Sequence, residues 1–512
     1  MERKLDVLFV NPDSSFQAYQ SLSRTYSAIE PPTWALLLAE SCRSKDFGVA
    51  ILDCGAEHLS IQEAVTRIAD ADARIVCFVM YGQNPNSGTT SMIGAELLGD
   101  AVKHEYPDSI ICFVGSHVSA LPKDVLALEC VDIVLLNEGV YALHSLLSTD
   151  LREESLSKVK GIGYKREGKG IINPPERVVP QERMDIDLPG YAWDLLPYRT
   201  SPLDMYRSHF WHAGYSHEHR SPFAAIYTSL GCMFKCSFCM VNIVNRTDNA
   251  DDVVAEHSAF MRYWSPQFII RQFEKLAEMG ISTVRLSDEM FFLNRKYFEP
   301  LLGGLIERNL RFRMWAYSRV DTVNMRHLDL FKKAGIDTLA LGIEAGDQAV
   351  RQEASKGSFK GTNIHKTVDM IRGHGLNVIA NYIFGLPDDS LETMQQTLVL
   401  AKELNTEAAN MYPCQALPGS GLYTTAKRNG WQLPATPAGY AFLSYECEPL
   451  PTRHCTPAEV LRFRDNAWAD YHSGANYLAL VERKFGRKER ENVEAMAQIK
   501  LRRKLLGDPP PE

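Results

Sequence analysis

The sequence predicts an α/β protein: an N-terminal Rossmann-like, doubly wound parallel sheet, then a (β/α)6 partial TIM barrel, then a helical C-terminal extension. Two runs of short apolar strands alternating with amphipathic helices, at residues 5–148 and 223–429, predict the two α/β parts. After Gly430 the pattern becomes helical. We expect a front domain at 1–150, a connector at 151–220, a barrel at 221–430 and a C-terminal region at 431–512.

Composition limits the class of protein. Of the 512 residues 45% are hydrophobic and 23% charged, which is typical of globular chains with several domains. The net charge of −8 gives no field that attracts a phosphate backbone, so we expect no nucleic-acid partner. No stretch reaches the roughly 18 apolar residues of a membrane span, and the chain runs from Met1 straight into a strand-like segment. We therefore expect a cytoplasmic protein.

In the front domain, five apolar segments are expected to form the parallel strands, at residues 6–10, 49–52, 75–80, 110–114 and 133–136. Helices are expected near residues 34–43, 61–69, 91–104 and 122–128. Ligands of such sheets bind at the carboxyl ends of the strands, where small and polar residues follow in this chain. No Gly-x-Gly-x-x-Gly follows the first strand, which disfavours a dinucleotide.

The connector contains an expected hairpin and two histidines. Residues 162–165 and 170–172 flank a charged glycine turn, which predicts the hairpin. His209 and His212 lie just before the barrel, where a packed and hydrogen-bonded pair is the favoured interpretation. A role as acid or base is the alternative, because histidine titrates near neutral pH.

Six strands are expected in the barrel, at residues 224–228, 283–286, 312–316, 338–341, 378–384 and 408–412. Helical patterns follow most of them, for example at 299–308 and 391–404. Six βα units rather than eight predict an open partial barrel, with its active site at the carboxyl ends of the strands.

Three cysteines follow the first of these strands with x3 and x2 spacing, Cys232, Cys236 and Cys239. Three thiolates can hold three irons of a [4Fe–4S] cluster and leave one iron open. A zinc site is the alternative, but this spacing lacks the paired two-cysteine arms and the fourth ligand of a closed zinc site.

On this motif the chain resembles the radical S-adenosylmethionine (radical SAM) superfamily. In that family the open iron chelates the amino and carboxylate groups of SAM, and one electron cleaves SAM to a 5′-deoxyadenosyl radical. The resemblance implies that the three cysteines are catalytic and bind the metal. It also implies contacts to SAM from the ends of later strands: Asp288 and Glu289 with the ammonium, Arg319 with the carboxylate, Glu344 with the ribose and residues 382–389 with the adenine.

Residues 114–122 and 132–139 resemble the cobalamin-binding domain that precedes the barrel in many radical SAM enzymes. The Asp-x-His-x-x-Gly motif that supplies a histidine to cobalt is absent, so we expect cobalt without a protein histidine. A flavodoxin-like sheet without a ligand is the alternative. The expected cobalamin contacts are Tyr81, Gln83, Asn84, Ser116, His117, Glu138 and Gly139, with residues 81–84 facing the lower side of cobalt.

The C-terminal part offers two further candidates. Cys414, Cys447 and Cys455 have irregular spacing, which favours buried or substrate-facing thiols over a second cluster. Basic runs at 483–490 and 500–504 lie beside acids, which favours solvated helix faces over phosphate binding.

Together the two resemblances imply a cobalamin-dependent radical SAM methyltransferase that methylates an unactivated carbon of a small molecule or biosynthetic intermediate. The implied cofactors are a [4Fe–4S] cluster, SAM and cobalamin, and the implied partner is an electron donor such as flavodoxin or ferredoxin. Cyclisation, ring contraction or oxidation without methyl transfer is the enzymatic alternative, and a cobalamin-binding regulatory protein is the non-enzymatic one. A tRNA methylthiotransferase is disfavoured, because it would need a second cysteine triad in the front domain.

Overall fold

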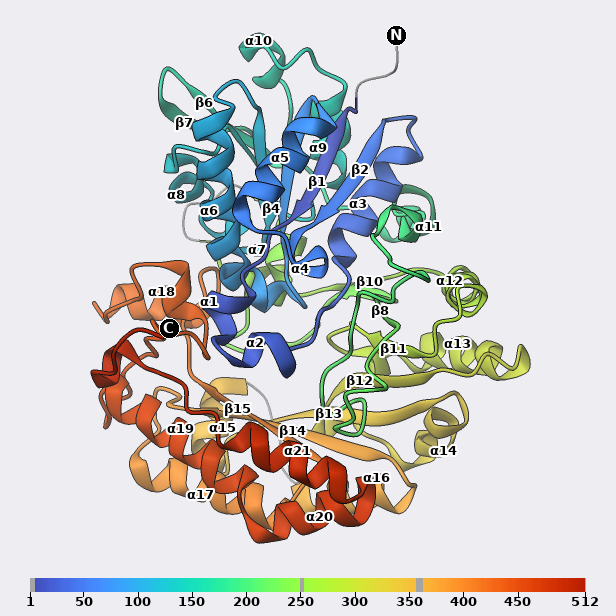
Figure 1. The fold of residues 1–512 in the computed structure, drawn as a ribbon, viewed down its shortest axis with the longest axis vertical. Coiled ribbons are helices and arrows are strands. Elements are labelled where there is room, and N and C mark those ends of the chain that lie inside the picture. The colour runs from blue at the N-terminus through green and yellow to red at the C-terminus, as the bar shows by residue number, and fades with distance from the viewer. Residues whose placement is uncertain (1–4, 249–252, 356–361, 512) are drawn as a thin grey trace.

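A computed structural model describes residues 5–248, 253–355 and 362–511. Figure 1 shows two layered parts, with the front domain above the barrel and the C-terminal helices along the lower side of the barrel. The α/β fold class with parallel sheets is as the sequence predicts.

The front sheet has seven strands in the order β2-β1-β3-β4-β5-β6-β7, and β1 to β5 are parallel. All five parallel strands expected from the sequence are present. The hairpin β6–β7, which the sequence analysis assigned to the connector, extends this sheet beyond residue 150 in antiparallel pairing. The strands are β1 (Val7–Asn11), β2 (Val49–Asp53), β3 (Ile75–Met80), β4 (Ile111–Gly115), β5 (Ile133–Leu135), β6 (Ile162–Arg166) and β7 (Lys169–Ile172).

Helices cover both faces of the front sheet. Because side chains alternate along a strand, Phe9 of β1 belongs to the buried cluster that includes α3 (Thr33–Arg43), whereas Val10 belongs to the cluster that includes α6 (Gly88–Glu105). This two-sided burial explains why the strands are apolar throughout. The other helices of the sheet are α5 (Ile61–Ala71), α7 (Ser116–Ala120), α8 (Pro122–Ala127) and α9 (Val140–Leu147).

The barrel sheet has six parallel strands in the order β15-β14-β13-β12-β11-β8. It is open, because β8 and β15 are its two edges. The strands are β8 (Phe223–Ile226), β11 (Thr283–Leu286), β12 (Arg313–Arg319), β13 (Ile336–Glu344), β14 (Asn377–Phe384) and β15 (Ala408–Pro413). The main helices between them are α12 (Pro266–Glu278), α13 (Arg295–Glu307), α14 (Met325–Lys333), α16 (Ile364–Gly373) and α17 (Leu391–Leu404).

The C-terminal region joins the two parts. Helix α19 (Pro457–His472) packs against β15 and α17, followed by α20 (Ala475–Phe485) and α21 (Arg487–Ala497). The chain then returns to the front domain, where Gln20 Nε2 donates to the carbonyl oxygens of Leu443 at 2.8 Å and Arg502 at 3.1 Å. Residues nearly 500 positions apart therefore enclose one space.

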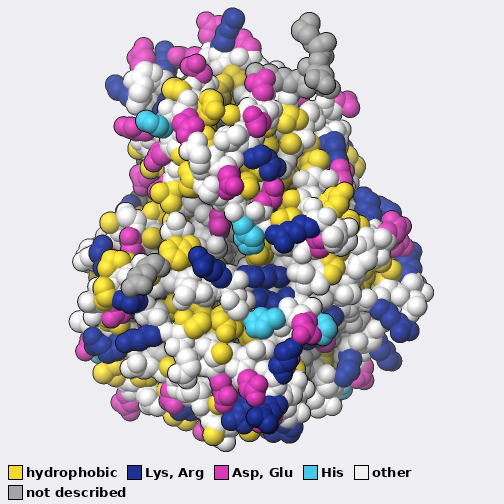
Figure 2. All heavy atoms as spheres, viewed as in Figure 1, with side chains coloured by type: hydrophobic (Ala, Val, Ile, Leu, Met, Phe, Trp, Pro, Cys, Tyr) yellow, Lys and Arg dark blue, Asp and Glu magenta, His cyan; other side chains and the backbone are white. Residues whose placement is uncertain are grey.

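The surface carries interspersed charges of both signs, and Figure 2 shows a hollow near the middle of one face with Lys and Arg side chains at its edge. Within the residues that the structure describes, no helix is long and apolar enough to cross a membrane.

Candidate active site

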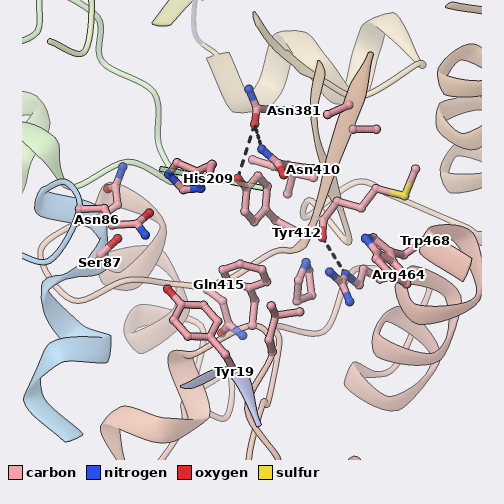
Figure 3. Close-up of a pocket in the computed structure, with 18 of the residues that line it drawn as sticks. Tyr19, Asn86, Ser87, His209, Asn381, Asn410, Tyr412, Gln415, Arg464 and Trp468 are labelled. Carbon is pink, nitrogen blue, oxygen red and sulfur yellow. Dashed lines mark hydrogen bonds between the residues drawn. The ribbon is translucent and has the colours of Figure 1, made fainter. Parts of the chain in front are cut away.

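A cavity of about 970 Å³ lies where the front domain, the barrel and the C-terminal region meet. Its walls come from the ends of β3, β12, β13, β14 and β15, from α19 and from the residues after α21. The carboxyl ends of the parallel strands open into this cavity, as expected for such sheets. Figure 3 shows part of its lining.

The three cysteines line the cavity on the loop after β9 (Ser229–Gly231). Gly231 has φ of +87°, and a Cβ there would lie 2.2 Å from the carbonyl oxygen of Phe260, so only glycine fits before the first cysteine. The backbone N–H of Cys232 donates to Asn242 Oδ1 at 2.8 Å, which fixes the start of the loop.

The chemistry of this loop fits a cluster. Burial raises the pKa of Cys232 to about 12 and that of Cys236 to about 11, so a positively charged iron is what would hold them as thiolates. Among the described residues no three His, Cys, Asp or Glu side chains surround a single metal ion. A [4Fe–4S] cluster does not require this, because each cysteine binds a different iron.

Asn86 connects the front domain to the cysteine loop. Its Oδ1 accepts from the backbone N–H of Met240 at 2.9 Å, and its Nδ2 lies 3.6 Å from Cys239 Sγ. Asn86 lies only two residues after the expected contact Asn84, whose Oδ1 accepts from the N–H of Asn86 at 3.0 Å. Asn86 was not among the expected site residues, although it belongs to the same polar loop after β3.

Arg319 ends β12 and lines the cavity. Its guanidinium forms a two-bond pair with Asp321, with distances of 2.9 and 3.0 Å, and lies 4.0 Å from the ring centre of Phe234. The remaining Nη1 lies 3.8 Å from Cys236 Sγ. We expected the guanidinium of Arg319 to pair with a SAM carboxylate. In the structure Nε and Nη2 bond Asp321, and Nη1 faces the cysteine loop.

Glu289 and Glu344 also line the cavity. Burial raises the pKa of each to about 7, with the charge of Arg285 opposing this at Glu289 and that of Arg319 opposing it at Glu344. Glu344 has φ of +66° where the pairing of β13 with β14 shifts register. Such a bulge re-aims the side chain, here toward the cavity.

Asp288 is placed differently from its neighbour Glu289. It is fully buried, does not line the cavity and accepts from the backbone N–H of Thr228 at 2.8 Å and of Ser229 at 2.8 Å. Its carboxylate is therefore occupied by the segment that leads into the cysteine loop, and we assign it a positioning role rather than the expected contact with SAM.

Of the expected cobalamin contacts, only Gln83 and Asn84 line the cavity. The others contact protein groups instead, most of them within the front domain and Glu138 with the barrel. Tyr81 donates to the carbonyl oxygen of Asn137 at 2.5 Å and stacks on Trp34, and Glu138 pairs with Arg262 at 2.8 Å. The remaining internal contacts are those of Ser116 with the carbonyl of Pro85 (2.5 Å), of His117 with Thr89 (3.0 Å) and of the Gly139 N–H with Asn137 Oδ1 (3.1 Å).

The two connector histidines have different surroundings. His209 lines the cavity, and its Nε2 lies 2.7 Å from Glu30 Oε1, whose other oxygen contacts Arg285 at 2.5 Å. Burial acts to raise the pKa of Glu30, but the charge of Arg285 and the bond to His209 hold it below its ordinary value. His212 is fully buried, and neither ring nitrogen has a hydrogen-bond partner among the described residues.

A polar group at the ends of β14 and β15 also faces the cavity (Figure 3). Asn410 Nδ2 donates to Asn381 Oδ1 at 3.0 Å, and the hydroxyl of Tyr412 lies 3.5 Å from the same oxygen. The sequence pattern predicted these two strands, but it did not single out Asn381, Asn410 and Tyr412 as site residues. Nearby, Cys414 is a buried thiol in the cavity wall, while Cys447 and Cys455 are buried thiols outside that wall.

Comparison with known families agrees with this geometry. Residues 20–147 match the B12 binding domain, and residues 226–401 match the radical SAM superfamily. The chain therefore combines a B12 binding domain with a radical SAM domain. Both matched ranges lie inside the domains expected from the sequence, whose outer limits stay a prediction.

Relatives of this radical SAM enzyme include methyltransferases and a cyclase. It is 24% identical to an uncharacterised methyltransferase of Pyrococcus horikoshii over 91% of this chain and 92% of the relative. It is 23% identical to the anaerobic magnesium-protoporphyrin IX monomethyl ester cyclase of Rubrivivax gelatinosus over 81% of this chain and 69% of the relative. The fold is similar to that of TsrM, a radical SAM methyltransferase of Kitasatospora setae, with a TM-score of 0.66 and 16% identity. The match covers 96% of this chain and 99% of TsrM.

Proposed function

We propose that this enzyme transfers a methyl group from SAM, by way of cobalamin, to an unactivated carbon of a small molecule. One observation carries the proposal: the cysteine triad and the polar loop after β3 of the B12 binding domain line the same cavity, and Asn86 of that loop contacts Cys239. Substrate in this cavity would be in reach of both cofactors.

Each part of the chain has a separate task. When bound, the cluster and SAM supply the one-electron chemistry that removes a hydrogen atom, and cobalamin supplies the methyl group. Cys232, Cys236 and Cys239 would hold three irons and leave the fourth for SAM. Glu289 and Glu344 would meet the polar groups of SAM, and Arg319 Nη1 would meet its carboxylate.

The loop after β3 would lie below cobalamin. Gln83 and Asn84 line the cavity at this strand end, and the sequence has no Asp-x-His-x-x-Gly motif. We therefore propose that cobalt has no histidine below it. His209, which also lines the cavity, has its Nε2 2.7 Å from Glu30 Oε1.

The reaction needs electrons from outside the chain, because each turnover that cleaves SAM consumes one. We propose that a flavodoxin or a ferredoxin supplies them, as the resemblance implies. A titration of the oxidised cluster with each reduced donor, followed by absorbance, would identify the donor.

The experiment that tests the function is anaerobic incubation of the reconstituted enzyme with cobalamin, reductant and SAM labelled in its methyl group. Methyl transfer predicts S-adenosylhomocysteine, 5′-deoxyadenosine and a labelled product. The Cys239→Ala variant is the matched control, and it should give no 5′-deoxyadenosine.

The cyclase relative supports a second candidate, radical ring closure without methyl transfer. The same incubation separates the two. Formation of 5′-deoxyadenosine and of a product that carries no label, without S-adenosylhomocysteine, would favour the cyclase function and contradict the methyltransferase.

A further inference from the structure

The cavity has a cationic end built by the C-terminal region. Four of its lining side chains there are cations and two are carboxylates: Arg462, Arg464, Lys500 and Arg503 against Asp465 and Asp508. In formal charge this end is therefore positive, although the whole chain is negative with a net charge of −8.

Both carboxylates are already engaged inside the protein. Asp465 accepts from Arg503 Nε at 2.9 Å and from Arg464 Nη1 at 2.8 Å. Burial acts to raise the pKa of Asp465, but the bonds from Arg503 and the charge of Arg464 lower it, so it stays ionised. Asp508 accepts from the backbone N–H of Arg503 at 2.9 Å. One carboxylate thus neutralises one of two buried arginines.

The other two cations are at the rim. Arg462 lies on α19 and Lys500 follows α21, and both are exposed while lining the cavity. No ion pair of either side chain is found within the described part of the chain. The basic run that includes Lys500 was expected on a solvated helix face; in the structure Lys500 is exposed, but it lies after the helix and at the rim of the cavity.

The wall beside the cations is aromatic. Trp468 stacks on His472 with ring centres 4.4 Å apart, and Arg464 lies 5.9 Å from the ring centre of Phe442. Burial lowers the pKa of His472 to about 4, so this ring is neutral at neutral pH and the positive charge comes from the arginines and the lysine. Figure 3 shows Arg464 and Trp468 across the pocket from Asn86 and Ser87, with Tyr412 between them.

We propose that the substrate carries an anionic group, phosphate or carboxylate, which binds at this cationic end while its reacting carbon points to the cysteine loop. Guanidinium and ammonium groups bind anionic oxygens strongly at partly buried sites. Because Asn86 contacts Cys239, the opposite end of the cavity is the one nearest the cluster. This inference rests on the proposed methyl transfer.

The test uses the holoenzyme, SAM labelled in its methyl group and an ultrafiltered metabolite extract of cells that make the protein. Before the reaction, anion exchange at pH 8 divides the extract into an acidic pool and a neutral or basic pool. We expect label to enter only the acidic pool. Phosphatase treatment of that pool beforehand should abolish labelling if the group is a phosphate and leave it if the group is a carboxylate.

The double variant Arg462→Gln/Lys500→Gln should lower labelling of a dilute acidic pool by about tenfold or more, and less in a concentrated pool, because binding is weakened. The matched control is Arg326→Gln/Lys366→Gln, which removes the same charge from exposed residues of α14 and α16 outside the cavity. Unchanged iron and cobalamin contents show that each variant is folded.

Three results would overturn the inference. Label in the neutral or basic pool would contradict a substrate with net negative charge. An equal loss of labelling in the test and control variants would show that the cationic end does not bind the substrate. Label in neither pool, with 5′-deoxyadenosine still formed, would overturn the proposed methyl transfer and this inference with it.

Discussion

The sulfurs of the cysteine loop have nitrogen donors beside them from two different parts of the chain. Arg319 Nη1 is next to Cys236 Sγ, and Asn86 Nδ2 is next to Cys239 Sγ. Donors at cluster sulfurs stabilise the negative charge that reduction adds, so they raise the reduction potential. At the residue scale, therefore, the B12 binding domain has a direct means of influencing the cluster.

Asn86→Ala should lower the midpoint potential of the reconstituted cluster, because both the donor at Cys239 and the bond to the Met240 N–H are lost. Redox titration followed by electron paramagnetic resonance measures this. Asn476→Ala, at an exposed asparagine on α20, is the control and should leave the potential unchanged. Equal potentials in both variants would show that Asn86 acts only as a structural contact.

Arg319→Ala should weaken SAM binding by about 2 kcal/mol, or roughly 30-fold in Kd, through loss of a charge-assisted bond. Arg319→Lys should recover part of this, because an ammonium keeps the charge but cannot also hold Asp321 in a two-bond pair. Calorimetry on the enzyme with an intact cluster measures both. Arg295→Ala, at an exposed ion pair on α13, is the control. Wild-type affinity in Arg319→Ala would assign this arginine to packing alone.

At the element scale, the ends of β1 and β2 are tied to the connector. Asp53 at the end of β2 is buried and accepts from Asn11 Nδ2 at 2.9 Å and from the hydroxyl of Tyr206 at 2.9 Å. Burial raises its pKa to about 6, and the hydrogen bonds only partly offset this. The junction of these elements should therefore respond to pH.

The folded state holds a proton on Asp53 that the unfolded chain, with an ordinary pKa near 3.8, has already lost. Between about pH 4 and pH 6 the folded state binds more protons, so this carboxyl makes stability fall as pH rises. Asp53→Asn should remove this slope, and its melting temperature relative to the wild type should be higher at pH 7 than at pH 4.5. A difference that is constant across this range, measured by scanning calorimetry, would contradict the shifted pKa.

At the scale of the whole molecule, three segments distant in sequence close the cavity. Gln20 is the clearest link, because it is almost fully buried and bonds both Leu443 and Arg502. The front domain is thereby connected to the C-terminal region that lines the cationic end.

Gln20→Ala should loosen this closure, because it leaves the carbonyl oxygens of Leu443 and Arg502 without their donor. We expect faster tryptic cleavage within residues 500–504 and more 5′-deoxyadenosine formed without substrate, since water and reductant reach the site more easily. Gln62→Ala, at an exposed glutamine on α5, is the control. Identical cleavage rates in the two variants would show that the contact does not hold the cavity closed.

Much of this organisation was determined by the sequence alone. The alternation of apolar and amphipathic segments predicted both parallel sheets, because burial on two faces leaves a pattern that local sequence carries. The spacing of Cys232, Cys236 and Cys239 likewise predicted the cluster loop, because ligands on one short loop are close whatever the rest of the fold does.

Only the tertiary structure decided which polar residues at the strand ends face the cavity. Asp288 and Glu289 are neighbours, yet one is bonded to Thr228 and Ser229 and the other lines the cavity, because β11 has ended at Leu286 and the chain turns at Glu289. Glu138 was expected to contact cobalamin, but its carboxylate pairs with Arg262, more than a hundred residues away. The cationic end depends in the same way on α19 and the segment after α21 meeting, which long-range packing decides and local sequence patterns do not encode.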